Sequence, residues 1–205
     1  MMSIVIAQNT KTKERALLRS PLTLLSVAVM VCGLVLFGQG LWIHAKAYAA
    51  QILLERAFTQ SIASGDKVKP WSWADTWPVA RIEAPRLAAS AIALNGASGQ
   101  ALAFGPGHLQ NTPKAGETGT AVYAAHRDTH FAFLKDVEKG DLIRITRDDG
   151  KIFTYRATQM TVTRWDEAQI DIHASGSNLV LATCYPFVAV TQGPLRYLVY
   201  AEFVE

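Results

Sequence analysis

Three residues of this chain have side chains that together could carry out acyl transfer: Cys184, His126 and Arg196. Cys184 ends the apolar run 178–183, and a proline two residues later stops a β-ladder at that point. His126 likewise follows the apolar run 120–125, and a further β-like run begins at Arg196. Strand ends often carry reactive groups, and these three can meet at one rim of a barrel.

Acyl transfer needs a thiolate nucleophile, an acid for the leaving amine and a hydrogen-bond donor for the oxyanion. Cysteine, histidine and arginine supply these functions in turn, and arginine can only donate because it is never neutral. Each residue also has an ordinary structural interpretation. Cys184 fits a buried strand residue, His126 a hydrogen-bonded surface residue and Arg196 a solvated charge, so residue types alone leave an inert thiol open.

Other reaction chemistries find little support in the sequence. It has no CxxC or HExxH pattern, no GxSxG elbow and no glycine-rich phosphate loop after a strand. His126 and His130 are four residues apart with Asp128 between them, but this segment is a strand end running into a loop, so we expect no metal site. Gly105-Pro106-Gly107 is interpreted as a turn. We expect the chain to need no metal or organic cofactor.

The elements that must position the three residues are short β-like runs bounded by turn residues. Asp148-Asp149-Gly150 predicts a hairpin, and 131–137 predicts a short helix. Seven or eight short strands with little helix predict a mainly β fold, a closed barrel or sandwich of about 130 residues. The expected strands are 79–84, 91–96, 120–125, 141–147, 151–164, 178–184 and 196–203.

The N-terminal part contains an apolar segment long enough to cross a bilayer. In Leu22–Ile43, 16 of 22 residues are hydrophobic and none is charged. As a helix this segment would span roughly 33 Å. Basic residues precede it, so the positive-inside rule predicts a cytoplasmic N-terminus. A cleaved signal peptide is the alternative, since Ala47-Tyr48-Ala49 resembles a cleavage site, but signal h-regions are shorter.

These features divide the chain into four regions. We expect a cytoplasmic basic tail at 1–21, a transmembrane anchor at 22–44, an extracytoplasmic helix and linker at 45–70, and the catalytic β-domain at 71–205. Within the third region, 45–62 is rich in helix formers. The tryptophan-rich stretch 67–78 is expected to pack on the domain.

The charge distribution excludes an obvious nucleic-acid face. Four of the 20 basic residues and one of the 17 acidic residues lie in positions 1–21, so the rest of the chain is neutral. The two cysteines exclude a disulfide scaffold. Cys32 falls within the apolar segment, which leaves Cys184 as the one thiol of the expected exported part.

The order and surroundings of the candidate residues resemble the sortase family. Three strings carry this resemblance: Leu181-Ala182-Thr183-Cys184, His126-Arg127 upstream of it and Arg196-Tyr197-Leu198-Val199 downstream. The strings FGPGH, AHRDTHFAFL, TCYPF and GPLRYLV most resemble the class found in Gram-negative bacteria. The family's usual Thr-Leu-x-Thr-Cys begins with Val180 here, and its frequent glycine before the histidine is Ala125.

The resemblance implies an eight-stranded β-barrel with short helices behind an N-terminal transmembrane helix. It implies that Cys184 is the nucleophile, His126 the general acid/base, and Arg196 the residue that steadies substrate and oxyanion. Thr183 would help to shape the substrate site. Asp128 and His130 would orient His126 or line the substrate groove, although both also fit polar loop residues.

The implied function is a membrane-anchored cysteine transpeptidase. It would cleave an LPxTG-like sorting signal of an exported protein through a Cys184 thioester and transfer it to an amine acceptor. Its partners would be that protein, the amine and the lipid bilayer, and it would lie in the inner membrane with a periplasmic domain. A hydrolytic cysteine peptidase on the same scaffold and a non-catalytic, membrane-tethered binding module remain alternatives.

Overall fold

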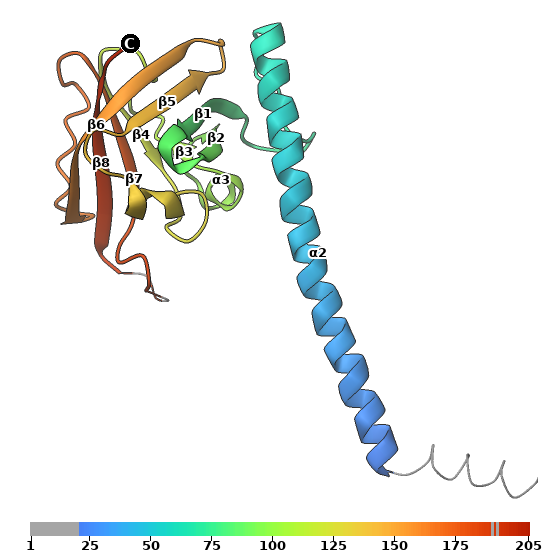
Figure 1. Cartoon of the computed structure of the whole chain (residues 1–205). Helices are drawn as coiled ribbons and strands as arrows, with labels where there is room; N and C mark the ends of the chain where they lie inside the picture. Colours follow the sequence, from blue (N-terminus) through green and yellow to red (C-terminus); the bar gives the residue numbers. More distant parts are fainter. Residues whose placement is uncertain (1–20, 190, 192) are drawn as a thin grey trace, which may run out of the picture. The chain divides into compact units, whose positions relative to one another are not determined.

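The computed structural model describes residues 21–189, 191 and 193–205 and contains a closed eight-stranded β-barrel that follows a long apolar helix in the chain (Figure 1). The mainly β prediction is therefore confirmed. Around the barrel the strands follow the order β1-β2-β3-β4-β7-β8-β6-β5. The strands are β1 (Pro78–Ala84), β2 (Ala89–Asn95), β3 (Gly107–His108), β4 (Gly119–Ala124), β5 (Leu142–Arg147), β6 (Ile152–Arg164), β7 (Ser177–Cys184) and β8 (Leu195–Phe203). The helices are α2 (Pro21–Ser64), η1 (Pro85–Leu87), α3 (Gly99–Phe104) and η2 (Ala132–Asp136).

All seven expected strands are present, and the turn at 148–150 joins β5 to β6 as an antiparallel hairpin. The expected short helix at 131–137 is the 3₁₀ helix η2. The interpretation of 105–107 as a turn was wrong at Gly107, which begins β3 and pairs with both β2 and β4. A Cβ atom at Gly107 would lie 2.4 Å from the carbonyl oxygen of Gly96, so glycine is required by close strand approach. Helix α3 was not predicted.

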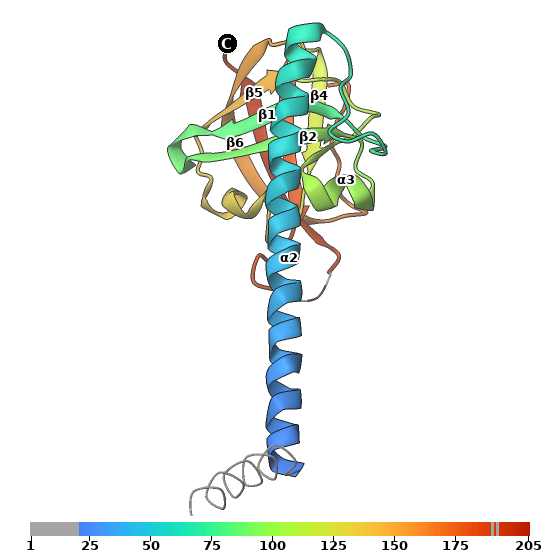
Figure 2. The ribbon, with the colours of Figure 1, turned by 90° about the vertical axis from the view of Figure 1, so that its right-hand side faces the viewer.

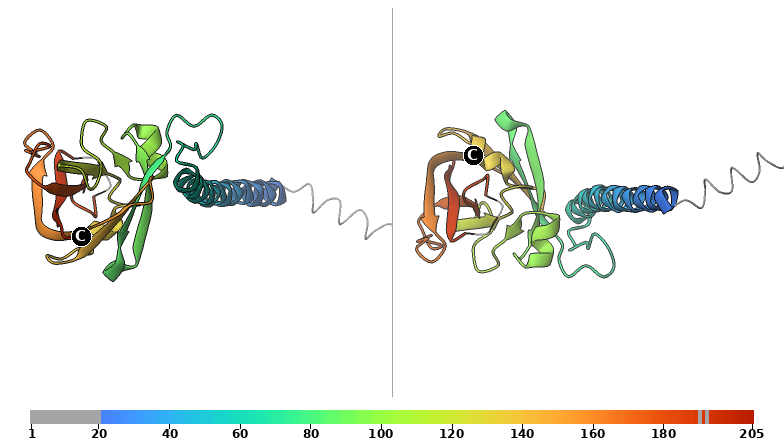
Figure 3. Two further views of the ribbon diagram at one scale, coloured as in Figure 1. Left: turned by 90° about the horizontal axis from the view of Figure 1, so that it is seen from above. Right: turned by 90° about the horizontal axis from the view of Figure 1, so that it is seen from below.

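Alternating residues of the strands fill the barrel, which Figure 3 shows as a ring of strands. Tyr123 and Tyr155 are the largest fully buried side chains of this core. In β7, Leu179 and Leu181 point inward. The intervening Val180 belongs to a second cluster with Val122, Leu198 and two residues of the β6–β7 loop, Ala168 and Ile170. That loop therefore covers part of the outer face of β4, β7 and β8.

Helix α2 contributes to two compact units, 1–49 and 50–205. In the described part of the first unit its side chains are largely exposed and apolar, and by length and composition α2 is able to cross a membrane. The expected basic tail falls almost wholly on residues 1–20, which lie outside the described residues.

The last turns of α2, residues 50–64, belong to the barrel unit and pack on its outside, in front of β1 and β2 in Figure 2. Leu54 and Phe58 are buried against Ile92 and Leu94 of β2 and against α3. Glu55 forms an ion pair with Arg81 of β1, and the guanidinium of Arg81 lies over the Phe58 ring. Of the helix predicted at 45–62, residues 50–62 are thus part of the packing of the barrel unit.

The tryptophan-rich stretch packs on the domain only in part. Trp71 meets the ring of Phe104 edge-on at 4.9 Å, and Trp77 stacks under the Lys67 ammonium group. Trp73 is 79% exposed, so the expectation that the whole stretch packs was wrong for that residue.

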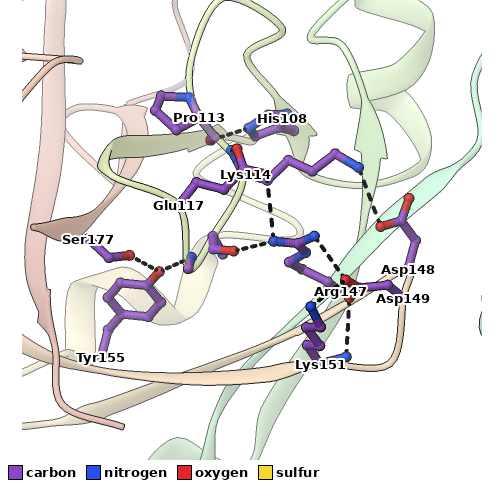
Figure 4. A network of polar contacts seen from close by, with 12 residues as sticks. His108, Pro113, Lys114, Glu117, Arg147, Asp148, Asp149, Lys151, Tyr155 and Ser177 are labelled. Carbon is purple, nitrogen blue, oxygen red and sulfur yellow. Dashed lines mark hydrogen bonds and ion pairs between the residues drawn. The ribbon is translucent and has the colours of Figure 1, made fainter.

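A polar network fastens the β3–β4 loop to the β5–β6 hairpin (Figure 4). Arg147 donates to the carbonyl of Ala115 at 3.1 Å and forms ion pairs with Asp149 and Glu117. The Tyr155 hydroxyl accepts from the Gly116 amide at 2.7 Å, which ties this loop to the barrel interior. The β3–β4 loop is therefore held by the ion pair and hydrogen bond to Arg147 and by the hydrogen bond to the Tyr155 hydroxyl.

The docking of α2 predicts a large stability effect for Leu54→Ala. Leu54 is fully buried, so its truncation leaves a cavity and should lower the free energy of unfolding by about 2–5 kcal/mol. Urea denaturation of the protein lacking residues 1–45 measures this. Leu53→Ala is the matched control, because Leu53 is 37% exposed and should change stability by less than about 1 kcal/mol. Equal effects of the two substitutions would contradict the docking.

Stability should also depend on pH through His108. Burial lowers the pKa of His108 from its usual 6.5, despite a hydrogen bond between its Nε2 and the carbonyl of Pro113. Below 6.5 the unfolded chain therefore binds more protons than the folded one, and stability falls as pH drops through that range. Urea midpoints at about pH 7.5 and about pH 5.5 should show the fall, and His108→Gln should reduce it. An unchanged pH dependence in His108→Gln would exclude this origin.

Candidate active site

Strand β7 lies between β4 and β8, and its pairing brings the three candidate residues together. In the antiparallel pair β7–β8, Cys184 is directly opposite Arg196. In the parallel pair β4–β7, Ala124 at the end of β4 is opposite Ala182. His126 follows Ala124 by two residues, just as Cys184 follows Ala182, so His126 leaves its strand at the level of the thiol.

Two hydrogen bonds extend this pairing beyond the end of β4. The amide of Ala125 donates to the carbonyl of Ala182 at 3.1 Å. The hydroxyl of Thr183, which is buried, donates to the carbonyl of Ala125 at 2.7 Å. Thr183 therefore fastens the residue before His126 to the residue before Cys184. Its hydroxyl faces this carbonyl inside the protein, and a substrate contact for Thr183 stays a prediction.

The loop after His126 is anchored to the barrel core. The carbonyl of His126 accepts a hydrogen bond from the amide of Phe131 at 3.1 Å, and the Phe131 side chain is fully buried. The imidazole of His126 itself is exposed. The backbone is thus fixed while the ring remains accessible to a substrate.

His130 and Asp128 lie in the same loop but differ in environment. His130 is half-buried, and its pKa is lowered first by that burial and then by the nearby charge of His126. A protonated His126 therefore favours a neutral His130. Asp128 is exposed, and no hydrogen bond joins it to His126 within the described part of the chain. The predicted orienting role of these two residues stays a prediction.

Cys184 and Arg196 share the outer face of the barrel. Side chains alternate along a strand, and Cys184 has the parity of the outer residue Val180, as Arg196 has that of Leu198. Both are half-buried. Cys184 is therefore only partly buried, unlike its outer-face neighbours Val180 and Leu198, which are fully covered.

The guanidinium of Arg196 is held by its own chain. Nη1 donates to the carbonyls of Gly193 and Leu195, both at 2.9 Å. Nε and Nη2 have no hydrogen-bond partner among the residues that the structure describes. Arg196 therefore has donors left from which a substrate carbonyl could accept a hydrogen bond.

An aromatic cluster closes the end of the barrel beside Cys184. Tyr185 and Phe187, which follow the cysteine, both contact the ring of Tyr197 on β8, with ring centroids 6.3 Å and 5.2 Å away. Phe187 and Tyr197 also pack on the main core. Sequence analysis assigned no role to these residues, although three aromatic residues this near the candidate cysteine and arginine were a visible signal.

Arg127, which follows His126, also contacts the candidate site and was given no role from the sequence. Its Nη2 atom donates to the carbonyls of Ala189 and Thr191 in the β7–β8 loop, at 2.6 Å and 2.8 Å. Only its place beside His126 could have singled it out. No group of three or more potential metal ligands is found in the described ranges.

The sequence matches the sortase domain model over residues 82–204, which is more than half of the chain. The chain belongs to the sortase family. It is 32% identical to sortase D of Bacillus subtilis (strain 168) over 124 residues, which are 60% of this chain and 62% of that protein. The alignment thus spans less than two thirds of this sortase relative.

Solved sortase structures have the same fold. Sortase A from Corynebacterium diphtheriae, in a lid mutant, superimposes with a TM-score of 0.59 at 24% identity, over 76% of this chain and 94% of that one. Sortase C-1 from Actinomyces oris gives 0.55 at 28% identity, over 62% and 75%. The predicted eight-stranded sortase barrel is therefore confirmed, whereas assignment to a Gram-negative class is not tested by these relatives.

The Thr183 contact predicts a positional effect on catalysis. Thr183→Val keeps the shape of the side chain but removes the donor to Ala125, so the His126 segment should shift and thioester formation should slow roughly ten- to a hundredfold. Thr183→Ser should retain most of the rate. Single-turnover mass spectrometry with a sorting peptide measures both.

Thr120→Val is the matched control for this experiment. The Thr120 hydroxyl on β4 is also buried and donates to the carbonyl of Asp171 at the same 2.7 Å, at the other end of the strand. Thr120→Val should lower the free energy of unfolding by a similar amount but leave the rate of thioester formation unchanged. If Thr120→Val slows thioester formation as much as Thr183→Val, the effect comes from stability in general and not from the position of His126.

Proposed function

We propose that this sortase is a membrane-anchored cysteine transpeptidase with Cys184 as nucleophile, His126 as general acid/base and Arg196 as oxyanion donor. The observation that carries the proposal is the strand register, which aligns Cys184 with Arg196 on β8 and with the residue 126 position after β4. Family membership supports the same reaction class.

In the first step the Cys184 thiolate attacks the carbonyl carbon of the scissile peptide bond. The carbon–sulfur bond forms, the carbon–nitrogen bond breaks, and protonated His126 gives its proton to the departing amine. In the second step an acceptor amine attacks the thioester and passes its proton to neutral His126, while sulfur leaves as thiolate. The enzyme thus returns to its starting protonation state.

Arg196 acts without transferring a proton. Its guanidinium is always charged, and its Nε and Nη2 donors can stabilise the negative charge that develops on the carbonyl oxygen. Donation to Gly193 and Leu195 through Nη1 already restrains the group. A fixed donor stabilises the transition state better than a mobile one, because less reorganisation is needed.

The substrate is proposed to be an exported protein with an LPxTG-like C-terminal sorting signal, cleaved between Thr and Gly. Residues 22–44 would anchor the enzyme in the inner membrane of a Gram-negative cell, with 1–21 in the cytoplasm. The helix and linker 45–70 and the domain 71–205 would lie in the periplasm. Anchoring enzyme and substrate in one bilayer raises their effective concentration without new contacts. The strings around His126 and Cys184 support the Gram-negative class.

A hydrolytic outcome on the same scaffold has one observation in its favour. His126 is exposed and Cys184 is half-buried, so water can reach the position where an acceptor amine would attack. The thioester would then be resolved by water, with a free carboxylate as product.

The decisive experiment is intact-mass analysis of residues 46–205 with a fluorogenic LPxTG-like peptide, with and without a primary amine. Wild type should form a thioester adduct on Cys184 and an amine-dependent product. Cys184→Ala should give neither, and Arg196→Ala should lower kcat roughly 10²–10³-fold because a transition-state donor is lost.

Other outcomes distinguish the alternatives. An adduct that is only hydrolysed, at every amine concentration, would favour the peptidase. Absence of an adduct from a panel of sorting peptides, together with slow alkylation of Cys184 by iodoacetamide, would overturn the enzymatic proposal and favour a binding module.

A further inference from the structure

The β7–β8 loop, residues 185–194, joins Cys184 to Arg196 and projects from the end of the barrel where β7 ends (Figure 1). At its base the amide of Tyr185 donates to the carbonyl of Leu195 at 3.0 Å. Further out, Val188 is 91% exposed. The pairing of Cys184 with Arg196 and the bond between Tyr185 and Leu195 hold the base of the loop, but they do not connect its outer part to the His126 segment.

Arg127 supplies that connection from the loop after β4. Its Nη2 atom bridges the carbonyls of Ala189 and Thr191, which are 62 and 64 residues away in the sequence. Arg127 is bonded directly to His126, so one short segment carries both the proposed acid/base and the clamp on the loop. Hydrogen bonds from charged donors are stronger than neutral ones.

The environment of Arg127 differs from that of a stabilising surface arginine. Arg81, Arg127 and Arg147 each have a buried side-chain nitrogen without a partner among the described residues. Arg81 and Arg147 are ion-paired to carboxylates and lie over aromatic rings. Arg127 has neither compensation within the described part of the chain. Only the Nη1 atom of Arg127 is buried in this way, while Nη2 makes both bonds to the loop, and a buried donor without a partner calls for an explanation.

We propose that Arg127 is a positioning residue of the transfer reaction. By clamping the β7–β8 loop to the His126 segment, it keeps Cys184 and Arg196 aligned with His126 during acylation and transfer. This inference rests on the proposed function of these three residues. Arg127 itself touches loop carbonyls and acts on the reaction through them.

The test compares Arg127→Gln and Arg127→Lys in the full-length protein, using the same peptide and amine. Gln removes the charge and shortens the side chain, so kcat should fall roughly ten- to a hundredfold, with KM within about threefold, because alignment of the reacting groups is lost. Both native bonds leave from one nitrogen, and a lysine ammonium also offers several donors on one nitrogen. Lys should therefore recover kcat to within about fivefold of wild type.

Arg86→Gln is the matched control. Arg86 also joins distant segments, through two hydrogen bonds to the Asp141 carboxylate and one to the carbonyl of Asp136, but it lies after β1, away from β7 and β8. It should lower thermal stability as Arg127→Gln does and leave kcat unchanged. Limited proteolysis provides a second readout, because Arg127→Gln should be cleaved faster within 185–194, whereas Arg127→Lys and Arg86→Gln should be cleaved as slowly as wild type.

The outcomes separate this inference from the function on which it rests. If Cys184→Ala is inactive while folded Arg127→Gln has wild-type kcat, the clamp is wrong and the transpeptidase stands. If Lys restores nothing, or if Arg86→Gln loses as much kcat, a general structural role replaces positioning. If Arg127→Gln does not fold, Arg127→Met takes its place, because methionine keeps the apolar stem but offers no donor. Wild-type kcat with unchanged loop cleavage in that variant overturns the inference. Activity in Cys184→Ala would overturn the proposed function itself.

Discussion

The pairing of β7 with two neighbours is the constraint on which the candidate site depends. His126 and Cys184 are far apart in the sequence, and only the parallel pairing of β4 with β7 brings their strand ends to one level. The antiparallel pairing with β8 then adds Arg196. Side chains alternate strictly along a strand, so a slip of one residue would turn Cys184 into the core and bring Thr183 out. Burial of Leu179, Leu181 and Thr183 opposes that slip.

Because the barrel is closed, the pairing of β7 also depends on the strands and loops that complete the ring. A parallel β4–β7 pair requires a long crossover connection, which here contains η2, the β5–β6 hairpin of the same barrel and the β6–β7 loop. Strand β3 completes the ring on the other side of β4 with only two residues. The last turns of α2 then cover the outer face of β2. The barrel end with the polar network is fastened by ion pairs, and the end with Cys184 mainly by backbone and aromatic contacts.

Most of the fold could be predicted because it depends on local patterns. Seven strands were visible as alternating or apolar runs, and 148–150 was a recognisable turn. Strand β3 was hidden because two residues carry no periodicity and Gly107 is typical of a turn; only the close approach of Gly96 explains it. Strand-end positions made a meeting of His126, Cys184 and Arg196 possible, but local sequence does not contain strand order. The register is what brings the three backbone positions to one level.

The contacts of Thr183 and Arg127, which local sequence could not indicate, share one property: each joins a side chain to a backbone carbonyl of a distant segment. Thr183 contacts Ala125, Arg127 contacts Ala189 and Thr191, and none of the three partners is distinguished by its residue type. A carbonyl is present at every position, so sequence patterns cannot indicate which one will be bound. Such contacts tolerate change in the partner side chain while they hold the partner backbone firmly. They therefore allow the exposed face of a reactive loop to vary with its substrate, while the geometry at both ends of the loop is kept.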